Sequence, residues 1–331
     1  MIAFESILRD ELSGFYLLRE ATVSKDTLER DRAMLLVFDR FLCDNGVVRK
    51  ELSEEIVSGW MQSLNVGRNT LVGKVVFLRI FIKYLNSMGI NAVIPEIPKY
   101  KNDYVPYIFS DDELKDIFVS ADNIAMTGKQ PNPYIQLELP MVLRMLYGCG
   151  LRVGETLSLK IGDVDFVGGI LTMRHTKGDK QRLVPMHPSL TAILHQYSHA
   201  MGLMGKPKAF LFPTAIHDVP LTNRTLRGKF KHTILREAGI LPIDKARCAR
   251  GPCLHCLRHV FAFKSFAQAE RAGRSVDDSV PYLSTYLGHE TLNETAKYLK
   301  FSSDLFPEAL ERFEDYTIDV FPEVFDNEKE W

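Results

Sequence analysis

The stretch from residue 91 to residue 108 constrains the fold of this chain most, because it contains Pro95, Pro98 and Pro106 among isolated polar residues. Proline cannot continue a helix, so we expect an extended linker here. A chain of 331 residues is also longer than one ordinary hydrophobic core requires. The sequence therefore predicts a domain at residues 1–97, a linker at 98–108, a second domain at 109–305 and a tail at 306–331.

The composition is typical of a globular protein outside the membrane. Apolar residues make up 46% of the chain and charged residues 25%, and no apolar run approaches the ~18 residues that span a bilayer. The N-terminus carries acidic residues and lacks the basic start of a signal peptide. The five cysteines are scattered and odd in number, which favours a reducing cytoplasm and no disulfide framework.

The charge distribution points to a polyanionic partner, although the net charge is only -1. Residues 301–331 carry a net charge of -8, which leaves +7 on the other 300 residues. Residues 171–260 carry 15 Lys/Arg and four Asp/Glu, and residues 56–95 carry four bases and no acid. Clustered bases are typical of phosphate binding, although a solvated basic surface would give the same counts.

Apolar residues at helical spacing predict helices at 27–46, 51–64 and 67–87, so the first domain is expected to be helical. In the second domain, Ser110 followed by three acids is a helix start, and residues 136–149 are a buried helix. Strands are predicted at 169–175 and 182–186, joined by a turn that contains Gly178, and helices follow residue 188. The predicted fold is mainly α with a small β-hairpin.

Four segments of the second domain carry residues suited to chemistry at a phosphate. They are LRVGE with Arg152 and Glu155, the turn TKGDK with Lys177, HCLRH with His255, Arg258 and His259, and LGH with His289 followed nine residues later by Tyr298. Each pattern is short, and surface bases or buried packing residues would explain any one of them alone. Their order along the chain is the informative feature.

Together these segments resemble the tyrosine recombinase, or phage integrase, family. That family has an Arg in a motif like LRxxE, a Lys in a β-hairpin turn, then HxxR, LGH and a Tyr nine residues on. Every element occurs here in that order, within residues 146–299. The resemblance covers the second domain by motif, and the helical first domain is similar to the core-binding domain of the family by architecture. It implies a two-domain site-specific DNA recombinase.

The resemblance implies a role for each residue, and the chemistry agrees with it. Tyr298 would attack the phosphodiester, giving a 3′-phosphotyrosine and a free 5′-hydroxyl without metal, ATP or other cofactor. Arg152 and Arg258 would hold the non-bridging oxygens, because planar guanidinium groups bind them in pairs. His255 and His289 would donate hydrogen bonds or move a proton, and Lys177 would protonate the leaving oxygen. Glu155 would orient this cluster or cap a helix, and His259 and His175 are interpreted as packing or strand residues.

The implied partner is double-stranded DNA with specific recombination sites, bound by a tetramer with possible partner recombinases or accessory proteins. Basic residues expected at the DNA surface, or simply at the solvent, are Arg68, Lys74, Arg79, Lys180, Arg182, Arg224, Arg227, Lys229 and Lys231. In the tail, Phe306, Phe313, Phe321 and Phe325 alternate with acids. This tail is expected either to dock on a neighbouring protomer or to be a disordered solubilising segment.

Several alternatives stay open at the level of sequence. Cys248, Cys253 and Cys256 with His255 form a C-x4-C-x-H-C pattern that could bind zinc, but the HxxR motif already uses His255, and we expect no metal. A type IB topoisomerase would share the chemistry, and a non-catalytic DNA-binding protein would share the fold. The divergent first domain and long tail favour a mobile-element integrase or transposase over a dimer-resolving recombinase. The target DNA sequence cannot be predicted.

Overall fold

The structure, a computed structural model, describes residues 4–99, 106–124, 132–174, 181–214, 219–240 and 251–300. The chain divides into two compact units, Met1–Tyr104 and Val105–Trp331, and each is described by itself. The boundary falls within the stretch expected to be a linker. None of the described helices is long and apolar enough to cross a membrane.

The first unit is helical. Its helices are α1 (Arg9–Thr22), α2 (Lys25–Asp44), α3 (Glu54–Ser63) and α4 (Arg68–Ser87). Ser24 and Ser53 cap α2 and α3 by accepting hydrogen bonds from Thr27 N and Ile56 N, which fixes where these helices begin. Phe15 of α1 packs edge-on against Phe81 of α4, so α1, which the sequence did not predict, completes the core.

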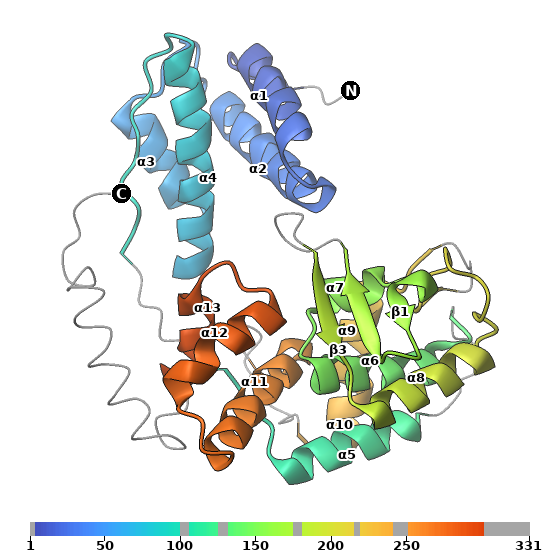
Figure 1. The fold of residues 1–331 in the computed structure, drawn as a ribbon. Coiled ribbons are helices and arrows are strands. Elements are labelled where there is room, and N and C mark those ends of the chain that lie inside the picture. Colours follow the sequence, from blue (N-terminus) through green and yellow to red (C-terminus); the bar gives the residue numbers. More distant parts are fainter. Residues whose placement is uncertain are drawn as a thin grey trace. The chain divides into compact units, whose positions relative to one another are not determined.

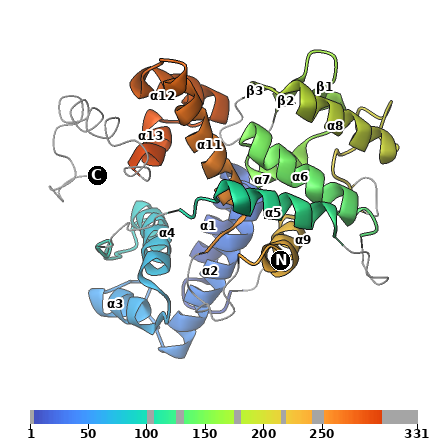
Figure 2. The same ribbon diagram turned by 90° about the horizontal axis from the view of Figure 1, so that it is seen from below.

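The second unit is mixed, as predicted, and most of it is helical (Figures 1 and 2). Its α-helices are α5 (Asp111–Asp122), α6 (Ile135–Cys149), α7 (Val153–Ser158), α8 (Pro188–Ala200), α9 (Asn223–Lys229), α10 (Leu235–Glu237), α11 (Leu254–Arg271), α12 (Val276–Leu287) and α13 (Leu292–Lys300). The mostly buried α6 contacts α5, α8 and α11, and α11 in turn contacts α12 and α13. The predicted helix at 136–149 is therefore confirmed as the centre of this core.

A small antiparallel sheet of three strands lies in the same unit, with β1 (Val164–Asp165), β2 (Ile170–Met173) and β3 (Arg182–Pro185) in that order. Leu171 pairs with Val184, and both are fully buried. The strands β2 and β3 are shorter than predicted, and β1 was not predicted. The turn at 175–180 lies outside the described residues. Because side chains alternate along a strand, Arg182 shares the inward face of β3 with Val184.

Candidate active site

Two glycines that end helices provide the framework of the site. Gly150 ends α6 and Gly288 ends α12, both in the left-handed conformation with φ of 58° and 66°. A β-carbon at Gly150 would lie 2.4 Å from Phe261, and one at Gly288 would lie 2.7 Å from Arg182. Glycine is therefore required in both motifs, GLR and LGH, by conformation and by space. The carbonyl groups at these helix ends carry partial negative charge and attract cations.

Arg258 on α11 joins the two helix ends. Its Nη1 donates to the Gly150 carbonyl at 2.6 Å and its Nη2 to the Leu287 carbonyl at 2.8 Å, and the residue is only 1% exposed. Burial lowers the pKa of Arg258, and its interaction with the hydroxyl of Tyr298 partly offsets that effect. Arg258 thus fixes the α6 and α12 ends while its guanidinium stays beside Tyr298.

Arg152 immediately precedes α7 and is the more accessible of the two arginines. Both of its terminal nitrogens lie 3.3 Å from the Gly288 carbonyl, and its Nη1 donates to Glu155 Oε1 at 2.9 Å. Its side chain is 30% exposed. Arg152 and Arg258 therefore lie against the same turn at the end of α12, with Arg152 half-buried and Arg258 fully buried.

Glu155 connects Arg152 to the sheet. Arg182 donates to both carboxylate oxygens of Glu155, at 3.2 and 2.9 Å, and to the Tyr286 carbonyl at 3.0 Å. Burial raises the pKa of Glu155, but the hydrogen bonds and charges of Arg182 and Arg152 outweigh it and hold the pKa at about 2. Glu155 also accepts from Arg152 N and so caps α7, which combines the two roles expected of it.

Arg182 does not have the position expected of a DNA-contact residue. Its side chain is 11% exposed, and its three nitrogens donate to Glu155 and to Tyr286 O. Its place on the inward face of β3 explains the difference. We interpret Arg182 as a positioning residue that holds Glu155, and through it Arg152.

Replacing Glu155 by Gln should remove stability in an acid-dependent way. A folded-state pKa of about 2, against an ordinary value of 4.5, contributes about 3 kcal/mol above pH 4.5, and this contribution is lost as the pH falls towards 2. The difference in free energy of unfolding between the parent protein and Glu155→Gln should therefore shrink between pH 4.5 and 2. Urea unfolding at several pH values measures it, with the exposed Asp112→Asn as control. A difference that does not change with pH would contradict the charged Arg182–Glu155–Arg152 network.

Tyr298 on α13 is 5% exposed and lies in a cluster of rings, stacked on His289 and edge-on to His259 and Phe263. The centroid of its ring is 5.2 Å from that of His259, 6.0 Å from that of His289 and 6.2 Å from that of Phe263. His255 follows at 4.6 Å from His259. The packing role predicted for His259 fits this position, between His255 and Tyr298, and its buried Nδ1 has no hydrogen-bond partner among the described residues.

The three histidines are held neutral. Burial lowers the pKa of His289 to about 3, helped by the charges of Arg258, Arg152 and Arg182. Burial and His255 lower that of His259 to about 3. Part of the His255 side chain is exposed to solvent. Burial of the rest of the ring, together with the charges of Arg258 and Arg152, lowers its pKa to about 4. The site has an excess of positive charge that an anion would neutralise.

Hydrogen bonds define the proton position on His289. Arg258 Nη2 lies 3.0 Å from Nε2 of His289 and can only donate, so Nε2 accepts. The proton is then on Nδ1, which donates to Thr295 Oγ1 at 2.6 Å. Thr295 is fully buried on α13, three residues before Tyr298. Sequence reasoning missed Thr295, and only its position one turn before the tyrosine could have indicated it.

The structure brings together Arg152, Glu155, His255, Arg258, His289 and Tyr298. Lys177, Lys180, His175, Cys248 and the tail lie outside the described residues. Among the residues expected at DNA, the exposed ones are Arg68, Arg224, Arg227 and Lys231. Lys74 and Lys229 are half-buried, and Arg79 donates to the Pro95 carbonyl.

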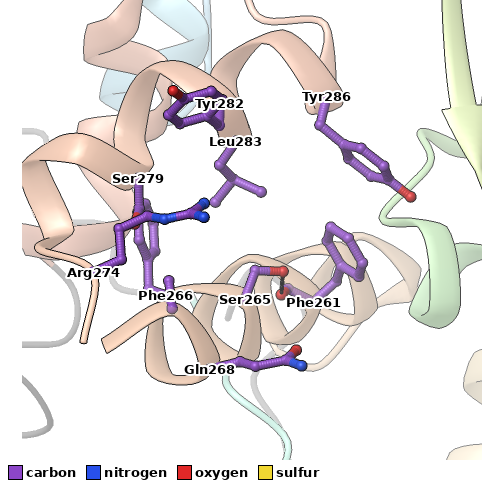
Figure 3. Close-up of a pocket in the computed structure, with 10 residues that line it drawn as sticks. Phe261, Ser265, Phe266, Gln268, Arg274, Ser279, Tyr282, Leu283 and Tyr286 are labelled. Atoms are coloured by element: carbon purple, nitrogen blue, oxygen red, sulfur yellow. Dashed lines mark hydrogen bonds between the residues drawn. The ribbon is translucent and has the colours of Figure 1, made fainter. Parts of the chain in front are cut away.

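A pocket opens between α11 and α12 (Figure 3). Its walls include Phe266 and Leu283, and the ring of Phe261 stacks on that of Tyr286 with centroids 5.4 Å apart. At the rim, the exposed Arg274 lies over the ring of Tyr282. The pocket therefore combines an aromatic interior with a cation at its edge.

Comparison with known proteins identifies the family of the chain. The sequence profile described as the phage integrase family matches residues 111–303, and the chain belongs to this family. It is a tyrosine-type site-specific recombinase. Among similar proteins, integrase/recombinase y4rB of Sinorhizobium fredii (strain NBRC 101917 / NGR234) is 30% identical over 294 residues, covering 85% of this chain and 89% of y4rB. Tyrosine recombinase XerC of Staphylococcus carnosus (strain TM300) is 24% identical, covering 88% of this chain and 92% of XerC.

Solved structures share the fold. XerH recombinase bound to its difH substrate has a TM-score of 0.65 at 19% identity, covering 87% of this chain and 80% of XerH. A lambda integrase fragment bound to a core site has a TM-score of 0.64 at 15% identity, covering 87% of this chain and 94% of that fragment. The predicted two-domain recombinase fold is thereby confirmed.

Proposed function

We propose that this protein exchanges strands between specific sites in double-stranded DNA through a covalent 3′-phosphotyrosine at Tyr298. The observation that carries the proposal is the convergence of Arg152, Arg258, His255 and His289 beside the hydroxyl-bearing ring of Tyr298. DNA as partner is supported by the XerH and lambda integrase structures, which are bound to DNA sites. Integration, excision or transposition of a mobile element is the proposed biological context.

The chemistry follows from the charges of the site. The Tyr298 oxygen attacks phosphorus, the bond to the 5′ oxygen breaks, and the phosphodiester energy is kept in the new bond, so no ATP is needed. The two guanidinium groups supply the positive charge that a metal would otherwise bring to the phosphate. Arg152 and Arg258 stabilise the charge that grows on the non-bridging oxygens. Burial is the main cause of the low pKa of His255, about 4, and of His289, about 3, and the arginine charges add to it. A phosphate between the arginines would offset the contribution of those charges and so raise both pKa values.

DNA entry requires a change at α13. Arg258 and Tyr298 are 1% and 5% exposed, and the guanidinium group of Arg258 interacts with the hydroxyl of Tyr298. A phosphate therefore reaches both side chains only when α13 shifts. The side chain of Arg152 is already accessible, and Glu294 of α13 lies 4.0 Å from it. We propose that the phosphate first meets Arg152, displaces Glu294 and so releases the tyrosine helix.

Lys177 is proposed as the general acid. It lies in the sequence between β2 and β3, and Arg182 anchors β3 to Glu155. Lys177→Ala should slow cleavage by about 10²–10⁴-fold, because the 5′ alkoxide then leaves unprotonated. A substrate with sulfur in place of that 5′ oxygen should restore the rate, since a thiol with a pKa of about 8.5 leaves without a proton. Single-turnover cleavage measures both rates, with Arg174→Ala as control. Slow cleavage of the sulfur substrate would contradict the assignment.

We further propose a tetramer in which the tail of one protomer docks on its neighbour. Phe306, Phe313, Phe321 and Phe325 alternate with acids, which suits the pocket of α11 and α12 with its aromatic walls and Arg274 rim (Figure 3). In a cyclic assembly each protomer would both give and receive a tail.

Truncation after residue 305 should therefore impair assembly on DNA and strand exchange while leaving cleavage of a single nicked site within about threefold, because the tail contributes no group to the chemistry. Tyr282→Ala, at the rim of the pocket, should have the same effect as the truncation. Gel filtration of DNA complexes and the two activity assays check this. Unchanged assembly and exchange in the truncated chain would show that the tail is only a solubilising segment.

The proposal is tested by incubating the purified protein with nicked duplexes from the DNA flanking its own gene, with a chelator and without ATP. An SDS-resistant protein–DNA adduct followed by exchange between two duplexes is expected. Adducts and relaxation of supercoiled DNA without exchange would instead identify a topoisomerase activity. Tight binding to this DNA without adducts would identify a non-catalytic DNA-binding protein.

A further inference from the structure

Two cysteines lie on either side of His255 at the beginning of α11. Cys253 is the residue that precedes the helix, and Cys256 is in its first turn, with the two Sγ atoms 3.6 Å apart. The backbone N–H of Cys253 points to Cys256 Sγ at 3.4 Å, so the two side chains face one another. None of the steps proposed for DNA cleavage uses either sulfur.

The surroundings give the two thiols different reactivity. Cys253 is half-buried and Cys256 is fully buried. The hydrogen bond from Cys256, which outweighs burial, lowers the pKa of Cys253 to about 6, and backbone N–H groups at the helix start and Arg227 act in the same direction. The same contact with Cys253 raises the pKa of Cys256. The greater exposure of Cys253, together with these pKa shifts, favours Cys253 as the attacking thiolate and Cys256 as the resolving thiol.

We propose that Cys253 and Cys256 form a redox modification site that closes to a disulfide with low-molecular-weight disulfides such as glutathione disulfide. Cys253 S⁻ attacks one sulfur of the oxidant and expels one glutathione thiolate. Cys256 then loses its proton and attacks Cys253 Sγ, expelling the second glutathione. Two protein thiols are oxidised to one disulfide, and the oxidant is reduced to two thiols.

Closure would distort the site. The two sulfurs must approach from 3.6 Å to about 2 Å, which pulls in the first turn of α11 around His255. One turn later, Arg258 is fixed by hydrogen bonds of 2.6 and 2.8 Å. A shift of about 1 Å at a catalytic group can cost about 100-fold in rate. Oxidation should therefore inhibit cleavage, an effect that rests on the proposed function, whereas disulfide formation does not.

Zinc is the competing use of these thiols. The described residues contain no group of three or more His, Cys, Asp or Glu side chains placed to hold a metal. A zinc site would therefore need Cys248, which lies outside the described residues. The experiment must distinguish a Cys253–Cys256 pair from zinc binding and from pairing with Cys248.

The test uses the full chain, equilibrated in buffers with increasing ratios of glutathione disulfide to glutathione, alkylated and mapped by peptide mass spectrometry. A peptide with Cys253 linked to Cys256, reversed by dithiothreitol and absent in Cys253→Ser and Cys256→Ala, is expected. Cys43→Ser, which removes an exposed cysteine elsewhere, should behave as the parent protein. Linkage of Cys253 to Cys248, or unreactive thiols with one zinc ion per chain, would overturn the proposal.

The adduct assay on the same samples tests the consequence. Oxidation should reduce adduct formation by about tenfold or more in the parent and in Cys43→Ser, and dithiothreitol should restore it, whereas Cys253→Ser should be insensitive. A quantitative Cys253–Cys256 disulfide with unchanged adduct formation would overturn the inhibitory effect. If the reduced protein forms no adduct at all, the proposed function is wrong. The peptide map still shows whether the Cys253–Cys256 disulfide forms.

Discussion

Tyr298→Phe should form no covalent adduct with DNA, with a loss of at least about 10⁴-fold in cleavage, because no other group can supply the attacking oxygen in its place. The ring contacts with His259, His289 and Phe263 are kept in this variant. Only the hydroxyl, which interacts with Arg258, is lost. Binding to DNA and the melting temperature should therefore change little, and the adduct assay measures the chemistry alone.

A second tyrosine of this region, Tyr286 on α12, provides a matched control. It also carries a hydroxyl, which donates to the Pro185 carbonyl, and its ring stacks on that of Phe261. Tyr286→Phe should form adducts at a rate within about threefold of the parent protein, because it keeps the ring and loses only the hydrogen bonds of the hydroxyl with the Pro185 carbonyl and Cys149, each worth roughly 1 kcal/mol. Adducts that persist in Tyr298→Phe and vanish in Tyr286→Phe would show that the nucleophile has been misassigned.

Arg258→Lys should lose both activity and stability. A single ammonium group cannot reach the Gly150 and Leu287 carbonyls together and still face a phosphate, because two different terminal nitrogens of the guanidinium donate to these two acceptors. Leaving one buried carbonyl without a donor costs about 1–3 kcal/mol. The lost transition-state contact costs about 10²–10³-fold in cleavage. Thermal unfolding and single-turnover cleavage measure the two effects separately.

Arg271→Lys is the control for this substitution. Arg271 is exposed in the last turn of the same helix, α11, so the same chemical change there should leave both measurements near the parent values. If Arg258→Lys kept full activity, Arg258 would have only the structural role of joining the ends of α6 and α12 by hydrogen bonds. Of the two arginines, Arg152 alone would then bind the phosphate.

The sequence predicted the residues of the site better than their arrangement. Arg152, Arg258, His255, His289 and Tyr298 could be selected because the motifs fix residue type, order and spacing. Nothing in the sequence shows that the two arginines are held by carbonyls at the ends of α6 and α12, because those contacts join residues 108 and 136 positions apart. Such contacts depend on how the helices pack.

Arg182 shows where charge alone is a poor guide. A basic residue after a basic hairpin turn suggested a DNA contact, yet alternation along β3 places Arg182 on the face of the buried Val184. The alternation of side chains along the strand can be recognised in the sequence, but an arginine is stable in a buried position only when a carboxylate pairs with it. That carboxylate, Glu155, lies 27 positions away in the sequence. The helix α1 and the two-residue strand β1 were missed because their periodicity is weak or too short to detect.

The arrangement also suggests why this site needs so few groups. Helix-end carbonyls and Glu155 hold two guanidinium groups in place before any substrate binds, so little reorganisation is required when charge develops on the phosphate. Burial and these cations keep His289 neutral, with its pKa at about 3.

The most direct test of this account is the chemical identity of the protein–DNA bond. The adduct should be digested, and the peptide and nucleotide ends identified by mass spectrometry and end labelling. The account predicts a phosphotyrosine at Tyr298 joined to the 3′ end of the cleaved strand, with a 5′-hydroxyl that accepts label from a kinase without prior dephosphorylation. A bond to any other residue, or a 5′-phosphate linked to the protein, would contradict it.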